Sequence, residues 1–327
     1  MIVVTGGAGF IGSNIVAALE QQNYTDIVVV DLLGSDDKWK NLAKRKFITI
    51  IPPRDTFTFL EANQDQIDAI IHMGAISQTT ETGVDLILRN NVDFSIKLWS
   101  FCCTHQKRLI YASSAATYGD GALGFDDDND LAALNALRPL NPYGWSKALF
   151  DRKVATDVAR GVRPKQYVGL KFFNVYGPNE YHKGEQQSVI AHLFPLVKNN
   201  KKVHLFKSYH PQYKDGQQQR DFVWVGDVVS VVCWLLENVQ VNGIFNVGSG
   251  EARSFYDLAC AVWHAVNLKP KIGFKPMPES LRDKYQYYTK ANLTRLRQAG
   301  FTKPTTSLEE GARKYVQQFL MQSDPYL

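Results

Sequence analysis

The chain has 327 residues, of which 45% are hydrophobic and 21% charged, and its formal net charge at pH 7 is +5. This length and composition are typical of a soluble globular protein with one large α/β domain or two unequal domains. The small positive charge forms no basic stripe with interleaved aromatic residues, which argues against a nucleic-acid partner.

No segment of the sequence predicts a membrane location or an oxidising compartment. No apolar run approaches the roughly 18 residues that a membrane-spanning helix needs. The first residues lack the basic region of a signal peptide and lead directly into a glycine loop. The four cysteines contain no Cys-x-x-Cys pair, so we expect reduced thiols and a cytoplasmic protein.

The N-terminal residues predict a strand, a tight glycine turn and a helix. Residues 1–5 are mostly apolar, and the segment Gly6-Gly7-Ala8-Gly9-Phe10-Ile11-Gly12 follows them directly. Glycines in such a turn leave no Cβ between the backbone and a pyrophosphate at the helix N-terminus. Because the pattern comes directly after a strand, it predicts a dinucleotide-binding site.

The end of the second predicted strand bears on which dinucleotide binds. The strand at 27–30 is followed by Asp31, 19 residues after Gly12, where a carboxylate normally binds the adenosine ribose and favours NAD. Lys38 and Lys40 come shortly afterwards, and a lysine of this group can neutralise the 2′-phosphate of NADP. The residues alone therefore do not distinguish NAD from NADP as the bound dinucleotide.

Strands and helices alternate as far as residue 173. Further strands are predicted at 47–51, 68–72, 108–112 and 166–172, and the longest helices at 86–105 and 143–160. This alternation predicts an α/β fold with a doubly wound, parallel Rossmann sheet. The acidic run at 126–130 has no apolar period and predicts a solvated loop.

The pattern changes after residue 173, where a smaller mixed α/β domain is predicted. Residues 1–173 are expected to form the dinucleotide-binding domain and residues 174–327 the substrate-binding domain. Residues 227–247 are expected to pack back on the first sheet.

The segment Asn141-Pro142-Tyr143-Gly144-Trp145-Ser146-Lys147 carries the predicted chemistry. Tyr143 and Lys147 are four residues apart, so on a helix both side chains lie on one face. An ammonium group close to a phenol lowers the pKa of the phenol. Such a tyrosine can take the proton of a sugar hydroxyl while a nicotinamide takes the hydride, and Ser114 is placed to hold the reacting oxygen. An ordinary surface helix fits Tyr-x-x-x-Lys equally, and the upstream glycine turn favours the catalytic interpretation.

These features resemble the extended short-chain dehydrogenase/reductase family, and within it the ADP-L-glycero-D-manno-heptose 6-epimerases. The narrower resemblance rests on the segments Ala112-Ser113-Ser114-Ala115-Ala116-Thr117-Tyr118-Gly119, Phe173-Asn174-Val175-Tyr176-Gly177-Pro178, His182-Lys183-Gly184, Gln219-Arg220-Asp221-Phe222-Val223, residues 243–250 and Tyr285-Gln286. It covers nearly the whole chain. The sequence departs from the pattern at residues 120–135, at Glu185, where a serine is usual, and in the loop at 208–219, which is longer than usual.

The resemblance implies an epimerase that inverts C6″ of ADP-D-glycero-D-manno-heptose by transient oxidation and re-reduction with bound NADP. It implies Tyr143 and Lys183 as acid/base groups for the two hydroxyl orientations, with Ser114 and Lys147 beside them. The cofactor contacts that it implies are Gly6, Gly9, Phe10, Ile11, Gly12, Asp31, Leu32, Lys38, Met73, Gly74, Ala75, Ile76, Ser77, Asn90, Lys147 and Val175. The substrate contacts that it implies are Ser114, Asn174, Glu185, His192, Phe206, Lys207, Ser208, Arg220 and Tyr285.

The resemblance further implies a homopentamer whose product serves lipopolysaccharide core assembly, and it implies no metal. Arg220 also has support from its chemistry, because a guanidinium group suits a nucleotide diphosphate.

Two alternatives remain open. A sugar-nucleotide dehydratase or a different NAD(P)-dependent epimerase can use the same frame, although Ala115-Ala116 follow Ser114 where dehydratases usually place acidic residues. A regulatory protein that senses NADP without turnover is the other alternative, and such proteins typically lose the tyrosine at position 143.

Overall fold

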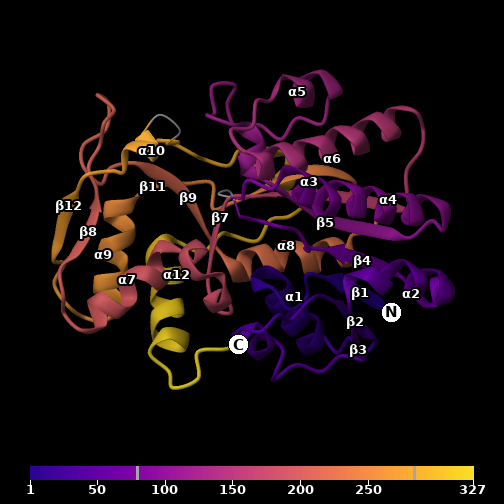
Figure 1. Ribbon diagram of the computed structural model, residues 1–327, viewed down its shortest axis with the longest axis horizontal. Coiled ribbons are helices and arrows are strands. Elements are labelled where there is room, and N and C mark those ends of the chain that lie inside the picture. The colour runs from indigo at the N-terminus through magenta and orange to yellow at the C-terminus, as the bar shows by residue number, and fades with distance from the viewer. Residues whose placement is uncertain (79–80, 283–284) are drawn as a thin grey trace.

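The computed structural model describes residues 1–78, 81–282 and 285–327 and has an α/β architecture (Figure 1). Its main element is a seven-stranded sheet in the order β10-β6-β5-β4-β1-β2-β3, in which every neighbouring pair is parallel. The strands are β1 Ile2–Thr5, β2 Ile27–Val30, β3 Thr49–Ile51, β4 Ala69–His72, β5 Arg108–Ser114, β6 Gln166–Phe172 and β10 Gly243–Val247. The predicted doubly wound parallel sheet is confirmed.

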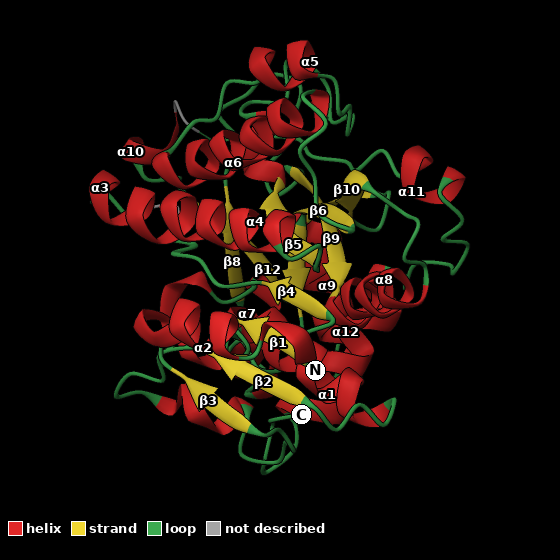
Figure 2. Cartoon of the chain, turned by 90° about the vertical axis from the view of Figure 1, so that its right-hand side faces the viewer, coloured by secondary structure: helices red, strands yellow, loops and turns green. Residues whose placement is uncertain are grey.

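Helices cover both faces of this sheet, which is why its central strands are continuous apolar runs. Ile2 and Val4 pack with residues of α1 and α8 on one face, whereas Val3 packs with residues of α4 and α6 on the other. Figure 2 shows these two pairs of helices on opposite sides of the sheet. The helices around the sheet are α1 Phe10–Gln21, α2 Thr56–Ala62, α3 Val84–Ile87, α4 Phe94–Thr104, α5 Leu131–Ala136, α6 Pro142–Ala159, α8 Val225–Glu237 and α11 Thr294–Gln298.

A smaller mixed region lies at one end of the large sheet, on the left in Figure 1. It contains a three-stranded sheet, β11-β9-β7, and a two-stranded parallel sheet, β12-β8. Its elements are β7 Asn174–Tyr176, β8 Val203–Phe206, β9 Gln219–Trp224, β11 Ala252–Ser254, β12 Ile272–Lys275, α7 Val189–Lys198, α9 Phe255–Ala265, α10 Glu279–Arg282 and α12 Leu308–Tyr315.

The structure differs from the sequence prediction where short segments gain partners from distant parts of the chain. β7 is not among the strands predicted from the sequence, and it is a strand because it pairs with β9. The prediction of a solvated loop at 126–130 is wrong at Asp127, which is buried and accepts a hydrogen bond from the backbone nitrogen of Asn246 at 2.8 Å. α8 packs on the large sheet, and β10 is the edge strand of that sheet beside β6. The predicted domain boundary at residue 173 stays a prediction.

Two kinds of feature are absent from the described residues. No helix among residues 1–78, 81–282 and 285–327 is long and apolar enough to cross a membrane. The same residues contain no group of three or more His, Cys, Asp or Glu side chains that fits a metal ion.

The tight turn between β1 and α1 makes a prediction for stability. A Cβ atom at Gly12 would overlap the carbonyl oxygen of Gly6, whereas a Cβ atom at Gly9 would lie 3.1 Å from that oxygen. We therefore expect Gly12→Ala to lower the free energy of unfolding by about 1–3 kcal/mol through overpacking. Urea denaturation measures the change, with Gly9→Ala as the matched control of smaller effect. Equal losses in the two variants would contradict this account.

Candidate active site

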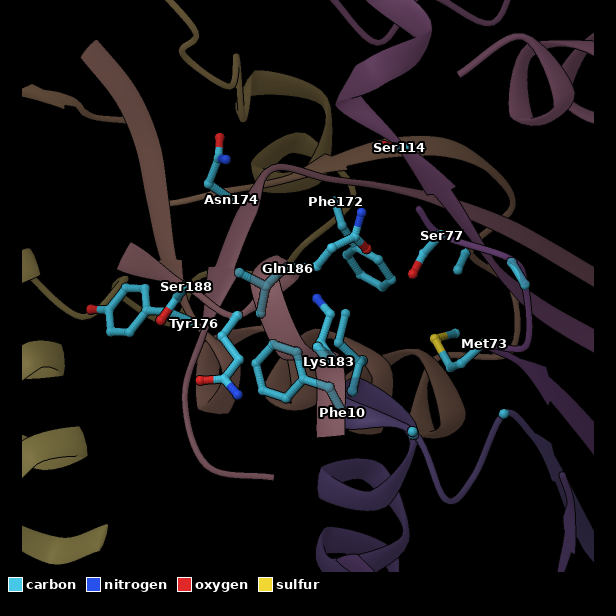
Figure 3. A pocket seen from close by; sticks show the side chains of 18 of the residues that line it. Phe10, Met73, Ser77, Ser114, Phe172, Asn174, Tyr176, Lys183, Gln186 and Ser188 are labelled. Atoms are coloured by element: carbon cyan, nitrogen blue, oxygen red, sulfur yellow. The ribbon is translucent and has the colours of Figure 1, made fainter. Parts of the chain in front are cut away.

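A cavity of about 510 Å³ lies beyond the carboxyl ends of the central strands (Figure 3). In an open α/β sheet, this is the position in which ligands bind. The cavity is lined by the turn after β1, the loop after β4, the end of β5 and the start of α6. It is also lined by η6, which is the 3₁₀ segment Tyr181–Gln186. The predicted site residues that line it are Gly6, Gly9, Phe10, Ile11, Gly12, Asp31, Lys38, Met73, Gly74, Ala75, Ser77, Ser114, Tyr143, Lys147, Asn174, Val175 and Lys183.

The glycine turn is held tightly against the loop after β4. Gly6 has a φ of 67°, and a Cβ atom there would lie 2.5 Å from the backbone nitrogen of Gly74. Gly74 in turn donates its N–H to Thr5 Oγ1 at 3.3 Å. Only glycine fits both the left-handed backbone and the close approach at position 6. The N-terminus of α1 is thereby left open to the cavity, which suits the pyrophosphate of a dinucleotide.

Asp31 and Lys38 form an ion pair at the edge of the cavity. Asp31 Oδ1 accepts a hydrogen bond from Lys38 Nζ at 2.6 Å, and Asp31 Oδ2 accepts one from the backbone nitrogen of Ala8 at 2.9 Å. Lys38 Nζ also donates to the carbonyl oxygen of Leu32, whose side chain is 64% exposed. Both charges therefore lie where the adenosine end of a dinucleotide is expected, because Asp31 directly follows β2.

The two neighbouring asparagines of the long helical segment have different surroundings. The predicted helix at 86–105 is α3, a π-helical segment η4 (Leu88–Asp93) and α4 in succession. Asn90 is exposed and donates to the carbonyl oxygen of Leu86. Asn91 is fully buried, and its amide binds both the N–H and the carbonyl oxygen of Ile76, at 2.8 and 2.9 Å. Asn91 thus holds the loop that lines the cavity, while Asn90 and Ile76 lie outside the cavity lining.

The start of α6 is pressed against the end of β5. Asn141 caps the helix by accepting a hydrogen bond from the N–H of Gly144 at 2.8 Å. A Cβ atom at Gly144 would lie 2.6 Å from the carbonyl oxygen of Ala116, so glycine permits this close approach. The result is that Tyr143 lies beside Ser114, and both residues line the cavity.

The ionisation of Tyr143 differs from the sequence prediction. Burial raises the pKa of Tyr143 above its usual value, and the hydrogen bond with Ser114 lowers the pKa only in part. The expected net lowering is wrong for this structure, because burial has the largest effect on the pKa of Tyr143. The Lys147 ammonium group donates to the carbonyl oxygen of Ala112 at 2.8 Å. Burial also lowers the pKa of Lys147 to about 8.

Lys183 reaches the same cavity from η6. Its Nζ lies 5.5 Å from the centre of the Phe10 ring, and Figure 3 shows the nitrogen pointing toward the middle of the cavity. Burial lowers the pKa of Lys183, while the charge of Glu180 raises it. Glu180 is fully buried and binds Ser188 Oγ at 2.7 Å, which anchors the segment that carries the lysine. A partly buried lysine with a lowered pKa is suited to acid/base chemistry.

The other predicted substrate contacts lie outside the cavity lining. His192 is exposed and its Nε2 is 3.1 Å from the carbonyl oxygen of Glu185. Arg220 is buried, and its guanidinium lies 5.2 Å from the ring of Tyr285 and 5.7 Å from the ring of Phe255, which lines the cavity. The remaining residues in this group are Phe206, Lys207 and Ser208, at the end of β8.

Sequence reasoning did not find several residues that line the cavity. His182, Gln186 and Ser188 flank Lys183, and their polar character within one loop was the available signal. The apolar side chains of Phe222, Phe255 and Leu258 carry no such signal, because locally they are ordinary core residues of the smaller region. The other residues missed are Ala112, Ser113, Phe172, Phe173, Tyr176, Gln187 and Val189.

A family model described as the NAD dependent epimerase/dehydratase family matches residues 2–248. The chain belongs to this family. It is 48% identical to the ADP-L-glycero-D-manno-heptose-6-epimerase of Nitratidesulfovibrio vulgaris (strain DP4), over 100% of both chains. It is 46% identical to the protein of the same name from Fusobacterium nucleatum subsp. nucleatum, again over 100% of both.

Solved structures of two named epimerases share the fold. The Helicobacter pylori ADP-L-glycero-D-manno-heptose-6-epimerase superposes with a TM-score of 0.76 at 25% identity, covering 97% of this chain and 95% of the other. A UDP-glucose 4-epimerase from Thermus thermophilus, in complex with NAD, gives a TM-score of 0.73 at 27% identity, covering 96% and 97%. The group that the glycine turn fits is therefore a nicotinamide dinucleotide.

The contrast between Asn90 and Asn91 predicts different effects of the same substitution. Asn91→Ala leaves the Ile76 backbone groups without their buried partner, so we expect a loss of about 1–3 kcal/mol in the free energy of unfolding. We also expect weaker dinucleotide binding, measured by calorimetric titration. The neighbouring Asn90→Ala is the control and should change stability by less than about 0.5 kcal/mol. A larger effect at Asn90 than at Asn91 would refute the assignment.

Proposed function

We propose that this protein is an epimerase that converts ADP-D-glycero-D-manno-heptose to ADP-L-glycero-D-manno-heptose by inverting C6″ with bound NADP. The observation that carries the proposal is that Tyr143 and Lys183, from α6 and η6, border the same cavity as the glycine turn. The 48% identity to a full-length relative of that name supports the choice of substrate. Incubating the pure protein with this sugar nucleotide and separating the C6″ epimers by chromatography tests it.

Inversion at one carbon needs acid/base groups that serve both orientations of its hydroxyl. In the forward direction, Tyr143 takes the proton of the C6″ hydroxyl, and Ser114 holds the oxygen by a hydrogen bond. When bound, the nicotinamide supplies the acceptor and donor of the C6″ hydride. After the sugar has turned over in the cavity, Lys183 gives a proton to the same oxygen on the opposite face. The return reaction exchanges the roles of Tyr143 and Lys183.

The ionisation of the two groups fits these roles. Burial raises the pKa of Tyr143, so its phenolate is a stronger base than that of an exposed tyrosine. Burial lowers the pKa of Lys183, so its ammonium group releases a proton more readily than an exposed lysine. The cavity is thus lined by a tyrosine with a raised pKa and a lysine with a lowered pKa.

Lys38 supports NADP over NAD as the bound dinucleotide. The Asp31 carboxylate by itself would repel a 2′-phosphate, and the ion pair at 2.6 Å neutralises it. The ammonium group is also a donor suited to a phosphate oxygen. The adenosine end of the site therefore accommodates the additional negative charge of NADP.

The remaining parts of the proposal rest on the resemblance of the sequence segments to the ADP-L-glycero-D-manno-heptose 6-epimerases. We infer a cytoplasmic homopentamer whose product enters lipopolysaccharide core assembly. Sedimentation velocity distinguishes a pentamer from smaller assemblies.

Substitution of the two acid/base residues tests the mechanism. We expect Tyr143→Phe and Lys183→Met each to lower the rate of C6″ epimerisation by at least about 100-fold, because each removes one proton-transfer group. The exposed Lys201→Met serves as the control and should keep the activity of the unchanged protein. Full epimerase activity in Lys183→Met would rule out the use of two bases.

Substitution of Lys38 tests the choice of dinucleotide. We expect Lys38→Ala to weaken NADP binding by about 10-fold or more, through loss of a charge-assisted hydrogen bond, and to leave NAD binding nearly unchanged. Fluorescence titration with both dinucleotides measures the two dissociation constants. Lys40, which pairs with Asp37 at 2.9 Å, offers the control variant Lys40→Ala. Equal losses for NADP and NAD in Lys38→Ala would argue against 2′-phosphate recognition.

A further inference from the structure

A buried ion pair lies directly behind the residues of the proposed reaction. Asp151 of α6 and Lys171 of β6 are joined at 2.9 Å, and each side chain is only 1% exposed. Removing two charges from water is unfavourable, and such pairs often contribute little net stability compared with apolar residues. The pair takes no part in the proposed proton and hydride transfers at C6″, and these transfers therefore do not explain its position.

Asp151 is the centre of a network that reaches the end of β5. Its carboxylate accepts hydrogen bonds from Tyr111 at 3.1 Å, from Ser113 at 2.7 Å and from Lys171. Lys171 Nζ also donates to Thr117 Oγ1 at 2.6 Å. The Thr117 hydroxyl then donates to the carbonyl oxygen of Ser114 at 2.8 Å, so the network returns to the strand end at the cavity.

The helix and the strand match residue by residue. Tyr143, Lys147 and Asp151 are spaced four residues apart, on one face of α6. The β5 residues Ala112 and Ser113 bind two of them, and Ser114 lines the cavity beside the third. Ala112 accepts from Lys147 at 2.8 Å, and Ser113 donates to Asp151 at 2.7 Å. The contact between Asp151 and Ser113 is therefore one of two hydrogen bonds that hold this face of α6 on the strand, and it lies one helical turn beyond Lys147.

The network also determines the charge around Lys147. Burial lowers the pKa of Lys147, and the carboxylate of Asp151 raises it. Burial raises the pKa values of Tyr111 and Tyr118 and lowers the pKa of His72 on β4 to about 3, which keeps these three groups neutral. The titratable and charged groups that face this region from the packed elements are His72, Tyr111, Tyr118, Tyr143, Asp151, Arg152 and Lys171. Asp151 is the carboxylate in this group of seven residues.

We propose that Asp151 is a positioning residue that fixes Tyr143 and Lys147 on the end of β5 and places its carboxylate one helical turn from the buried Lys147 ammonium group, with Lys171 neutralising part of that charge. Lys171 contacts the Asp151 carboxylate, and Lys147 lies one helical turn from it, so removing the carboxylate and removing Lys171 must change the charge around Lys147 in opposite directions. The inference rests on the proposed function in that Tyr143 and Lys147 act in the reaction.

The first test measures the titration of Lys147 directly. Protein labelled with ¹³C at lysine Cε is titrated by NMR, and Lys147→Arg identifies the signal. We expect Asp151→Asn to move the Lys147 midpoint down by about one pH unit, because it removes the carboxylate and leaves Lys171 charged. We expect Lys171→Met to move it up, because the carboxylate then faces Lys147 without its other partner. Shifts in the same direction, or no shift, would overturn the proposal.

The second test measures the pH dependence of epimerisation. The alkaline limit of the rate should move with the Lys147 midpoint in both variants, and the conservative Lys171→Arg should restore the pH profile of the unchanged protein. A merely structural role would lower stability and activity in both variants without opposite shifts. If Asp151→Asn does not fold, Lys171→Met decides alone, since a midpoint that stays or falls contradicts the proposal. An unchanged protein without epimerase activity would refute the proposed function, while the NMR titration would still decide this inference.

Discussion

The close contact between the N-terminus of α6 and the end of β5 is the constraint on which the site depends. Gly144 allows the helix to approach the carbonyl oxygen of Ala116, and Asn141 caps the helix at this point. These two local features place Tyr143 against Ser114 at the mouth of the sheet. A side chain larger than hydrogen at position 144 would separate helix and strand, and the reacting groups would lose their common geometry.

Three lysine side chains place positive charge around this contact. Lys147 and Lys183 face the cavity, and Lys38 lies at its edge, with burial lowering the pKa values of the first two. Buried cations without full compensation are unfavourable in an empty protein, because charge is better solvated by water. They become favourable when an anionic ligand enters. The phosphates of a dinucleotide and of a sugar nucleotide are such ligands, so the same residues connect recognition and catalysis.

The segment that carries Lys183 depends on distant parts of the chain for its position. Asn41 Nδ2 lies 3.2 Å from His182 Nδ1, and Asn179 Oδ1 accepts a hydrogen bond from the N–H of Leu327 at 3.0 Å. Tyr181 donates to the carbonyl oxygen of Pro325 at 2.9 Å. The loop therefore reaches the glycine turn because η1 (Asp37–Asn41) and the last residues of the chain both hold it. One acid/base group is built into a regular helix, and the other is held by tertiary contacts.

The sequence by itself determined the parallel sheet, the glycine turn and the Tyr143–Lys147 pair. These features depend on local periodicity, backbone freedom and spacing along one helix, all of which a single segment contains. The tertiary structure alone decided that Asn91 rather than Asn90 holds the cavity loop, that Asp127 is buried and that burial raises the pKa of Tyr143. Burial and electrostatic environment arise from segments far apart in the chain, so no local pattern encodes them. For the same reason, no local pattern in the sequence indicated that Phe222 and Phe255 line the cavity.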